Sequence, residues 1–226
     1  MPNTITIDPM NPPQMTPEVQ AALTPRDCLE LLKAGNLRFV EEEFLGHDHM
    51  AKVKATATGQ FPYAIILSCI DSRIPTEILF DKGPGDIFNA RIAGNFVNTD
   101  ILGSMEFACA VAGSKLIVVM GHTSCGAVKG ACDHVQLGNL TEMLKKLEPA
   151  VEATPTKPGE ERSSANADFV NRVAQKNVEL TMDQILKDSP VLNDLFVKGK
   201  IGLVGAMYDV ATGKVSFGDL KVKSRA

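Results

Sequence analysis

The sequence predicts an α/β fold in which helices flank a mostly parallel central sheet, with an N-terminal helical arm before it. Two observations predict this class. Residues 63–69 and 115–122 are short, continuous apolar runs, as expected of strands that are covered on both faces. Segments with helical spacing of apolar residues separate the predicted strands, and such an alternation builds βαβ units with parallel strands.

An arm and one helix come before the first strand. The first residues are rich in Pro, Asn, Thr and Met, so we expect residues 1–26 to form an arm that lies free or across a partner subunit. Apolar residues at helical spacing predict a helix over 28–44, with Asp27 as its candidate cap. Residues 46–60 are polar and are expected to be a connection. The rest of the chain, 27–226, is expected to be one domain.

The first βαβ unit is predicted between residues 63 and 93. The apolar run 63–69 is the first strand, and 74–80 can form a short helix with Pro75 in its first turn. Turn residues at 83–85 then introduce a second strand over 86–93.

The next elements continue the alternation. Residues 100–112 have helical spacing, and Gly113 stands where a C-terminal cap belongs. Branched apolar residues make 115–122 the strongest predicted strand. A short helix is expected from 126, and an amphipathic helix over 139–151.

The last third of the chain is predicted to contain a long helix and two strands. A polar loop over 153–165 leads to a helix over 168–187, which ends before Pro190. Residues 200–210 and 214–220 are expected to be strands joined by a short turn.

Composition excludes several classes of function. The formal net charge is −4, from 23 basic and 27 acidic residues, so a nucleic-acid partner is not expected. The sequence holds no apolar run of about 18 residues, so a membrane span is not expected. The N-terminus has neither a basic start nor an apolar stretch typical of a secretory signal, and we expect a cytoplasmic protein. The five cysteines are then expected to be reduced, buried or metal-bound.

Cys and His residues follow two of the predicted strands. Cys69 ends the strand 63–69, and His122 and Cys125 lie in the loop after 115–122. In parallel sheets the carboxyl ends of neighbouring strands meet at one edge, where ligands collect. Two thiolates and one imidazole suit zinc, and three protein ligands leave a fourth tetrahedral position for water or substrate. The sequence therefore predicts a catalytic zinc site.

Asp71 and Arg73 share the loop with Cys69. Arg73 could hold the Asp71 carboxylate in a bidentate pair and keep it ionised, so that Asp71 accepts a hydrogen bond from water at the metal. An alternative is that Asp71 binds the zinc itself at low pH and closes the site. A plainer alternative is that Asp71 only caps the following helix.

At these residues the sequence resembles the β-class carbonic anhydrases. The motifs are CIDSR at 69–73 and HTSC at 122–125, and the stretches 83–95, 189–190 and 199–215 are also similar to the family. The likeness extends over residues 27 to 220. It implies a zinc bound by the two Cys and the His, an Asp–Arg dyad, and a homodimer, tetramer or larger assembly.

The resemblance also implies a substrate pocket. Its positions hold Gln60, Phe88 and Phe107, the last of which replaces the Tyr of plant-type members, and Ile74 adds a further apolar wall. A Trp of the bicarbonate-regulated subclass is replaced by Ile66, which argues against that regulation, although Arg91 and Tyr208 match its other partners.

The expected reaction is the reversible hydration of carbon dioxide to bicarbonate and a proton. Two thiolate ligands offset the charge of the zinc, so we expect it to acidify bound water less than a three-His site does. A related hydrolase acting on carbonyl sulfide or carbon disulfide is the alternative, because such similar substrates cannot be separated by sequence pattern. A structural zinc protein with Asp71 as a permanent fourth ligand is another. An alcohol dehydrogenase is excluded, since no GxGxxG follows a strand.

Overall fold

The computed structural model describes residues 7–223 and confirms the predicted α/β fold. Its sheet has five strands in the order β2-β1-β3-β4-β5, and β2, β1, β3 and β4 pair in parallel while β5 is antiparallel to β4. The strands are β1 (Ala64–Ser68), β2 (Ile87–Arg91), β3 (Leu116–His122), β4 (Gly202–Tyr208) and β5 (Val215–Phe217).

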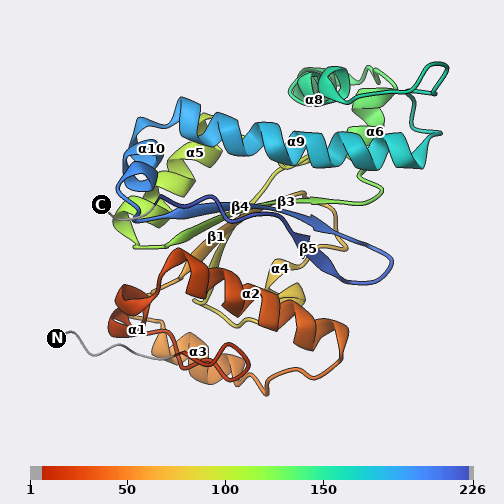
Figure 1. The fold of residues 1–226 in the computed structure, drawn as a ribbon. Helices are drawn as coiled ribbons and strands as arrows, with labels where there is room; N and C mark the ends of the chain where they lie inside the picture. The colour runs from red at the N-terminus through yellow and green to blue at the C-terminus, as the bar shows by residue number, and fades with distance from the viewer. Residues whose placement is uncertain (1–6, 224–226) are drawn as a thin grey trace.

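Helices cover both faces of this sheet (Figure 1). The helices α1 (Pro17–Ala22), α2 (Pro25–Val40) and α3 (His49–Ala55) lie on one side, and α5 (Thr99–Glu106), α9 (Ala167–Asp188) and α10 (Pro190–Val197) lie on the other. The remaining helices are α4 (Thr76–Leu79), the π-helical turn η1 (Phe107–Val111), α6 (Gly126–Cys132), α7 (Gly138–Leu144) and α8 (Glu148–Ala153).

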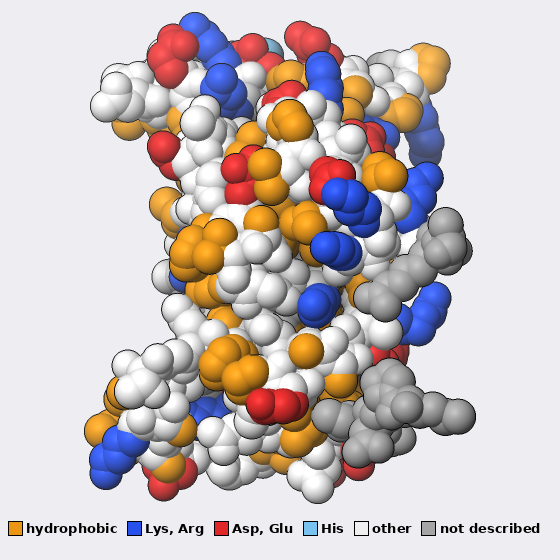
Figure 2. Space-filling view, turned by 90° about the vertical axis from the view of Figure 1, so that its left-hand side faces the viewer, with side chains coloured by type: hydrophobic (Ala, Val, Ile, Leu, Met, Phe, Trp, Pro, Cys, Tyr) orange, Lys and Arg blue, Asp and Glu red, His pale blue; other side chains and the backbone are white. Residues whose placement is uncertain are grey.

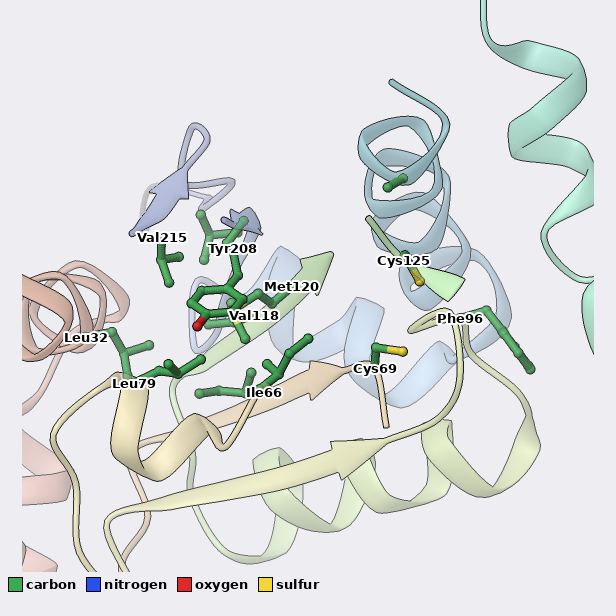
Figure 3. Packing of buried hydrophobic residues seen from close by; sticks show 14 of the residues in the cluster. Leu32, Ile66, Cys69, Leu79, Phe96, Val118, Met120, Cys125, Tyr208 and Val215 are labelled. Carbon is green, nitrogen blue, oxygen red and sulfur yellow. The ribbon is translucent and has the colours of Figure 1, made fainter. Parts of the chain in front are cut away.

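Alternation along the strands divides the core into two clusters. Every residue of β1 and of β3 is buried, as expected of parallel strands covered on both faces. Ile66 and Val118 pack with Leu32 of α2 on one face, as Figure 3 shows. Their neighbours along the chain point to the opposite face and pack against α9 and α10. The two central strands are thereby fixed, and with them the loops at their ends.

The boundaries of α2 differ from the prediction. Its cap is Thr24 and not Asp27: the Thr24 hydroxyl accepts from the Asp27 amide, and the Asp27 carboxylate accepts from the Thr24 amide. The helix ends at Val40, four residues early, and Glu42 just beyond it has a φ of 59°. This left-handed backbone leaves the helical path, so Phe44 is half-exposed.

The arm packs on the body of its own chain over the residues that the structure describes. Gln20 in α1 donates to the carbonyl oxygens of Pro62 and Ala112, both at 2.8 Å. Arg38 donates to the carbonyl oxygens of Pro9 and Met10. The start of the arm, residues 1–6, lies outside the described residues.

Two other segments differ from their predicted form. The expected connection 46–60 contains α3, which Asp48 caps by accepting from the Ala51 amide. The amphipathic segment 139–151 is divided into α7 and α8, and Pro149 stands in the first turn of α8. Pro lacks the amide hydrogen that a continuous helix would use there, so one helix cannot continue without interruption through this position.

Figure 2 shows the side of the molecule that lies on the left in Figure 1. Hydrophobic, basic and acidic side chains are intermixed on it. No helix within residues 7–223 is long and apolar enough to cross a membrane. All five cysteines are free and buried.

Candidate metal centre

Three side chains converge where β1 and β3 end. The sulfur atoms of Cys69 and Cys125 and a ring nitrogen of His122 all lie within 4.8 Å of one another, and all three residues are buried. Cys69 directly follows β1, His122 is the last residue of β3, and Cys125 precedes α6. In Figure 3 both sulfur atoms point into the same space at this edge of the sheet. The parallel pairing of β1 with β3 produces this meeting.

The imidazole of His122 is oriented by its own loop. Nδ1 lies 2.9 Å from the carbonyl oxygen of Thr123, which can only accept, so Nδ1 carries the proton. Nε2 then carries no hydrogen and offers a lone pair. It is fully buried and has no hydrogen-bond partner in the described part of the chain. A buried acceptor without a partner is costly unless something binds it. The side chain is thus arranged as a metal ligand through Nε2.

The two thiols lie close together, and each shifts the pKa of the other. The neighbouring Cys125 lowers the pKa of the Cys69 thiol, and Cys69 together with burial raises the pKa of Cys125. Further donors, among them the amide of Gly94 at 3.4 Å from the Cys69 sulfur, also favour the Cys69 thiolate. The site therefore holds two thiols of different acidity and an imidazole lone pair. This donor set and its close spacing fit tetrahedral zinc.

A buried amide supports the Gly94 contact. Asn177 of α9 donates from Nδ2 to the Gly94 carbonyl oxygen at 2.8 Å. Gly94 has a φ of 82°, a conformation that other residues rarely adopt, and a Cβ there would collide with the side chain of Leu147. Asn177 and Gly94 together hold an N–H group against the Cys69 sulfur.

Asp71 and Arg73 form the bidentate pair that the sequence predicted. Arg73 donates from Nε and Nη2 to the two carboxylate oxygens at 2.9 and 2.7 Å, and its amide donates to Asp71 at 3.0 Å. These bonds hold the pKa of Asp71 well below its usual range, so the carboxylate is ionised. Within residues 7–223 the metal-type cluster contains the two Cys and the His, and Asp71 is outside it.

Two residues support the site in roles that sequence reasoning did not predict. Arg91, at the end of β2, donates to the carbonyl oxygens of Cys69 and Asp71 at 2.9 and 2.6 Å and so holds the ligand loop. Asn171 of α9 accepts from the amide of Ser124, whose φ is 56°. The sequence identifies neither role, because each depends on which strand or helix lies beside the loop.

The four expected pocket residues are not all near the metal cluster. Ile74 is fully buried in the same apolar cluster as Cys69 and Cys125. Phe88 and Phe107 pack edge to face with ring centroids 6.2 Å apart, and Phe107 is 52% exposed. Phe88 pairs with Ile65, at the opposite end of β1 from Cys69. Gln60 is exposed and precedes β1, so it too lies at that opposite end.

Sequence comparison supports one family for this chain. A family model described as carbonic anhydrase matches residues 64–215. Carbonic anhydrase 2 of Mycobacterium tuberculosis is 34% identical over 197 residues, which cover 83% of this chain and 90% of that protein. A carbonic anhydrase of Mycolicibacterium smegmatis is 34% identical over 190 residues, 81% of this chain and 88% of that protein.

Solved structures agree with the sequence relatives. A crystal structure of a β-carbonic anhydrase of Aspergillus fumigatus superposes with a TM-score of 0.67 at 29% identity, covering 76% of this chain and 82% of that one. A chain from the crystal structures of two tetrameric β-carbonic anhydrases of Sordaria macrospora gives a TM-score of 0.63 at 27% identity, covering 76% and 91%.

Proposed function

Because the chain belongs to the β-carbonic anhydrase family, we propose that it reversibly hydrates carbon dioxide to bicarbonate and a proton at a zinc ion held by Cys69, His122 and Cys125. The observation that carries the proposal is the buried Nε2 of His122, which has no partner among residues 7–223 and lies within 4.8 Å of the sulfur atoms of Cys69 and Cys125. Zinc at such a site supplies a Lewis acid that makes water nucleophilic near neutral pH.

The Asp71–Arg73 pair gives the site a fixed hydrogen-bond acceptor. Because Asp71 is ionised, it can only accept hydrogen bonds, and Arg73 uses part of that capacity. We assign the rest to a hydrogen bond from water in the site, which would orient its lone pair toward carbon dioxide. Arg73 also holds the carboxylate apart from the three ligands, which favours a catalytic site over a structural site with four protein ligands.

The expected pocket residues suggest that two copies of the chain form one site. The strand register places Phe88 three residues before Arg91, roughly 10 Å along β2 from the level of Ser68. Yet β2 is an edge strand, and Phe107 beside it is largely exposed. We propose that a second copy covers this edge, so that Phe88, Phe107 and Gln60 line the partner's site. The tetrameric relatives of Sordaria macrospora support an oligomer.

Stopped-flow hydration, with the zinc content measured on the same sample, tests the reaction. Cys69→Ser should lose both zinc and activity. Cys132→Ser, which changes another buried thiol outside the cluster, should keep both. Asp71→Asn should keep its zinc and lose activity across the pH range. A pure wild-type protein that is active without metal would refute the zinc assignment, and full activity of Asp71→Asn would refute the role of Asp71.

Subunit mixing tests whether the site is shared. One variant carries Cys69→Ser and the other carries Phe88→Ala with Phe107→Ala, so each alone should be nearly inactive. If the pocket serves the partner's metal centre, dissociating and reassociating an equal mixture should restore roughly a quarter of wild-type activity. No gain, in a mixture shown by mass spectrometry to contain both chains in one oligomer, would contradict the shared site.

A cytoplasmic location remains a prediction of the sequence.

A further inference from the structure

A second cavity lies at the amino ends of the strands, away from the metal centre. Its volume is about 590 Å³. Its walls come from residues 11–15, from α2 and α3, from Tyr63 just before β1, and from the chain that leads into β2. In Figure 1 these helices lie on one side of the sheet. Pockets for small organic molecules have this size, whereas one water occupies only about 30 Å³.

Two hydrogen-bond donors in the wall of this cavity have no acceptor. The Tyr63 side chain is 1% exposed, and its hydroxyl has no partner in the described chain. Lys82 is 7% exposed, and none of the hydrogen bonds or ion pairs found within residues 7–223 involves its ammonium group. Burial without a partner is costly for the Tyr63 hydroxyl. Both groups line a space that is large enough to hold an acceptor.

The carboxylates nearby are already used by other groups. Asp81 accepts from Arg38 Nε at 2.5 Å, from the Leu45 amide at 3.2 Å and interacts with His47 Nε2 at 2.7 Å. Asp86 accepts from Lys52 Nζ and from the Gly83 amide.

The ion pairs around the cavity leave one cation of its wall without a carboxylate partner. Asp81 pairs with Arg38 and Asp86 pairs with Lys52, whereas no ion pair within residues 7–223 involves Lys82. Asp48 also lines the cavity, but it is exposed and caps α3. Burial, together with the neighbouring charge of Arg38, lowers the pKa of Lys82 to about 8, and a bound anion would reverse that effect.

We propose that this cavity binds a small organic carboxylate, with its carboxylate group between the Lys82 ammonium and the Tyr63 hydroxyl. The rest of such a ligand would lie against the apolar wall of Met15, Leu31 and Ala51. This site is independent of the zinc assignment, because it shares no residue with the metal cluster.

Calorimetric titration of the zinc-loaded, full-length protein tests the site. The probes are butyrate and hexanoate, with butyramide as the uncharged match of butyrate. We expect both acids to bind wild-type protein at millimolar concentration, hexanoate more tightly, and butyramide at least tenfold more weakly than butyrate. Equal binding of butyrate and butyramide, or no binding of either acid, would overturn the proposal.

Variants separate this cavity from anion binding at the metal. Lys82→Met should weaken butyrate binding at the cavity at least tenfold, and Tyr63→Phe, which removes only the hydroxyl, at least threefold. Lys200→Met makes the same charge change at an exposed residue outside the cavity and should leave binding unchanged. Hydration activity should stay at the wild-type level in all three variants. Unchanged butyrate affinity in both folded cavity variants would place the bound acid elsewhere and refute the assignment.

Discussion

Replacing Asn177 by Leu would remove one buried hydrogen bond while keeping the number of side-chain heavy atoms. In the native protein Nδ2 of Asn177 holds the Gly94 carbonyl at 2.8 Å, and the Gly94 amide in turn donates to the Cys69 sulfur. The variant leaves that carbonyl buried without its partner. It also releases the peptide that faces the sulfur.

The two consequences differ in size and in kind. A buried carbonyl that loses its donor destabilises the fold by about 1–3 kcal/mol. Groups that orient a metal ligand from behind typically change metal affinity about 10- to 100-fold when removed. We therefore expect Asn177→Leu to bind zinc about 10- to 100-fold more weakly, with a matching loss of zinc-dependent activity under chelator competition.

Chelator competition for zinc and urea unfolding, measured on the same preparations, separate the two effects. Gln20→Leu is the matched control, because Gln20 is also a buried amide that donates to main-chain carbonyls, yet its partners lie away from the cluster. It should lower the free energy of unfolding and leave zinc affinity unchanged. If Asn177→Leu lost stability to the same extent and kept wild-type zinc affinity, the supporting role of Asn177 would be wrong.

Three further perturbations follow from the same structure. Gly35→Ala should unfold much more easily in urea, because a Cβ there would overlap a main-chain carbonyl at the end of α4. In Gly103→Ala the new Cβ meets nothing within 4 Å, so the free energy of unfolding should rise by up to about 1 kcal/mol. Equal effects of the two substitutions would contradict the packing. The pKa of Lys82 falls from 10.5 in the unfolded chain to about 8 on folding, so between these values the unfolded chain binds more protons and stability rises with pH. Without added carboxylate, the free energy of unfolding should therefore rise from pH 8 to 10 by on the order of 2 kcal/mol more in wild type than in Lys82→Met, and parallel curves would refute this. Arg91→Met removes two hydrogen bonds to the loop that carries Cys69 and Asp71, and it should lower kcat/KM for hydration by about tenfold or more in stopped flow. An unchanged kcat/KM would show that this loop keeps its conformation without Arg91.

The sequence predicted those parts of the site that depend on topology alone. Cys69 and His122 end two apolar strands, and parallel neighbours must bring such ends together, so the metal cluster followed from the pattern. The Asp71–Arg73 pair is local in the chain and was equally predictable. The support from Asn177 and Arg91 was not, because a polar residue in a helix or at a strand end has no sequence signal for the carbonyl that it will meet.

Errors in the fold also have identifiable causes. The polar segment 46–60 was expected to be a connection because α3 has no buried residue to give it an apolar period. Thr24 and Asp27 form a reciprocal cap, so either could be taken for the capping residue until the backbone is known. Phe88 and Gln60 were assigned to the pocket by resemblance; in a single chain they lie at the other end of β1 from Cys69, and their place in a pocket remains a prediction.

The proton that the Cys125 thiol keeps because its pKa is raised has a consequence for how a metal ion would enter the cluster. A divalent cation entering the cluster must displace that proton, so loading is an exchange of one species for another. Acid then competes directly with the ion: where the pair still holds its proton, each unit fall in pH should weaken loading about tenfold. At low pH a chelator should therefore remove the ion under conditions in which the protein is still folded.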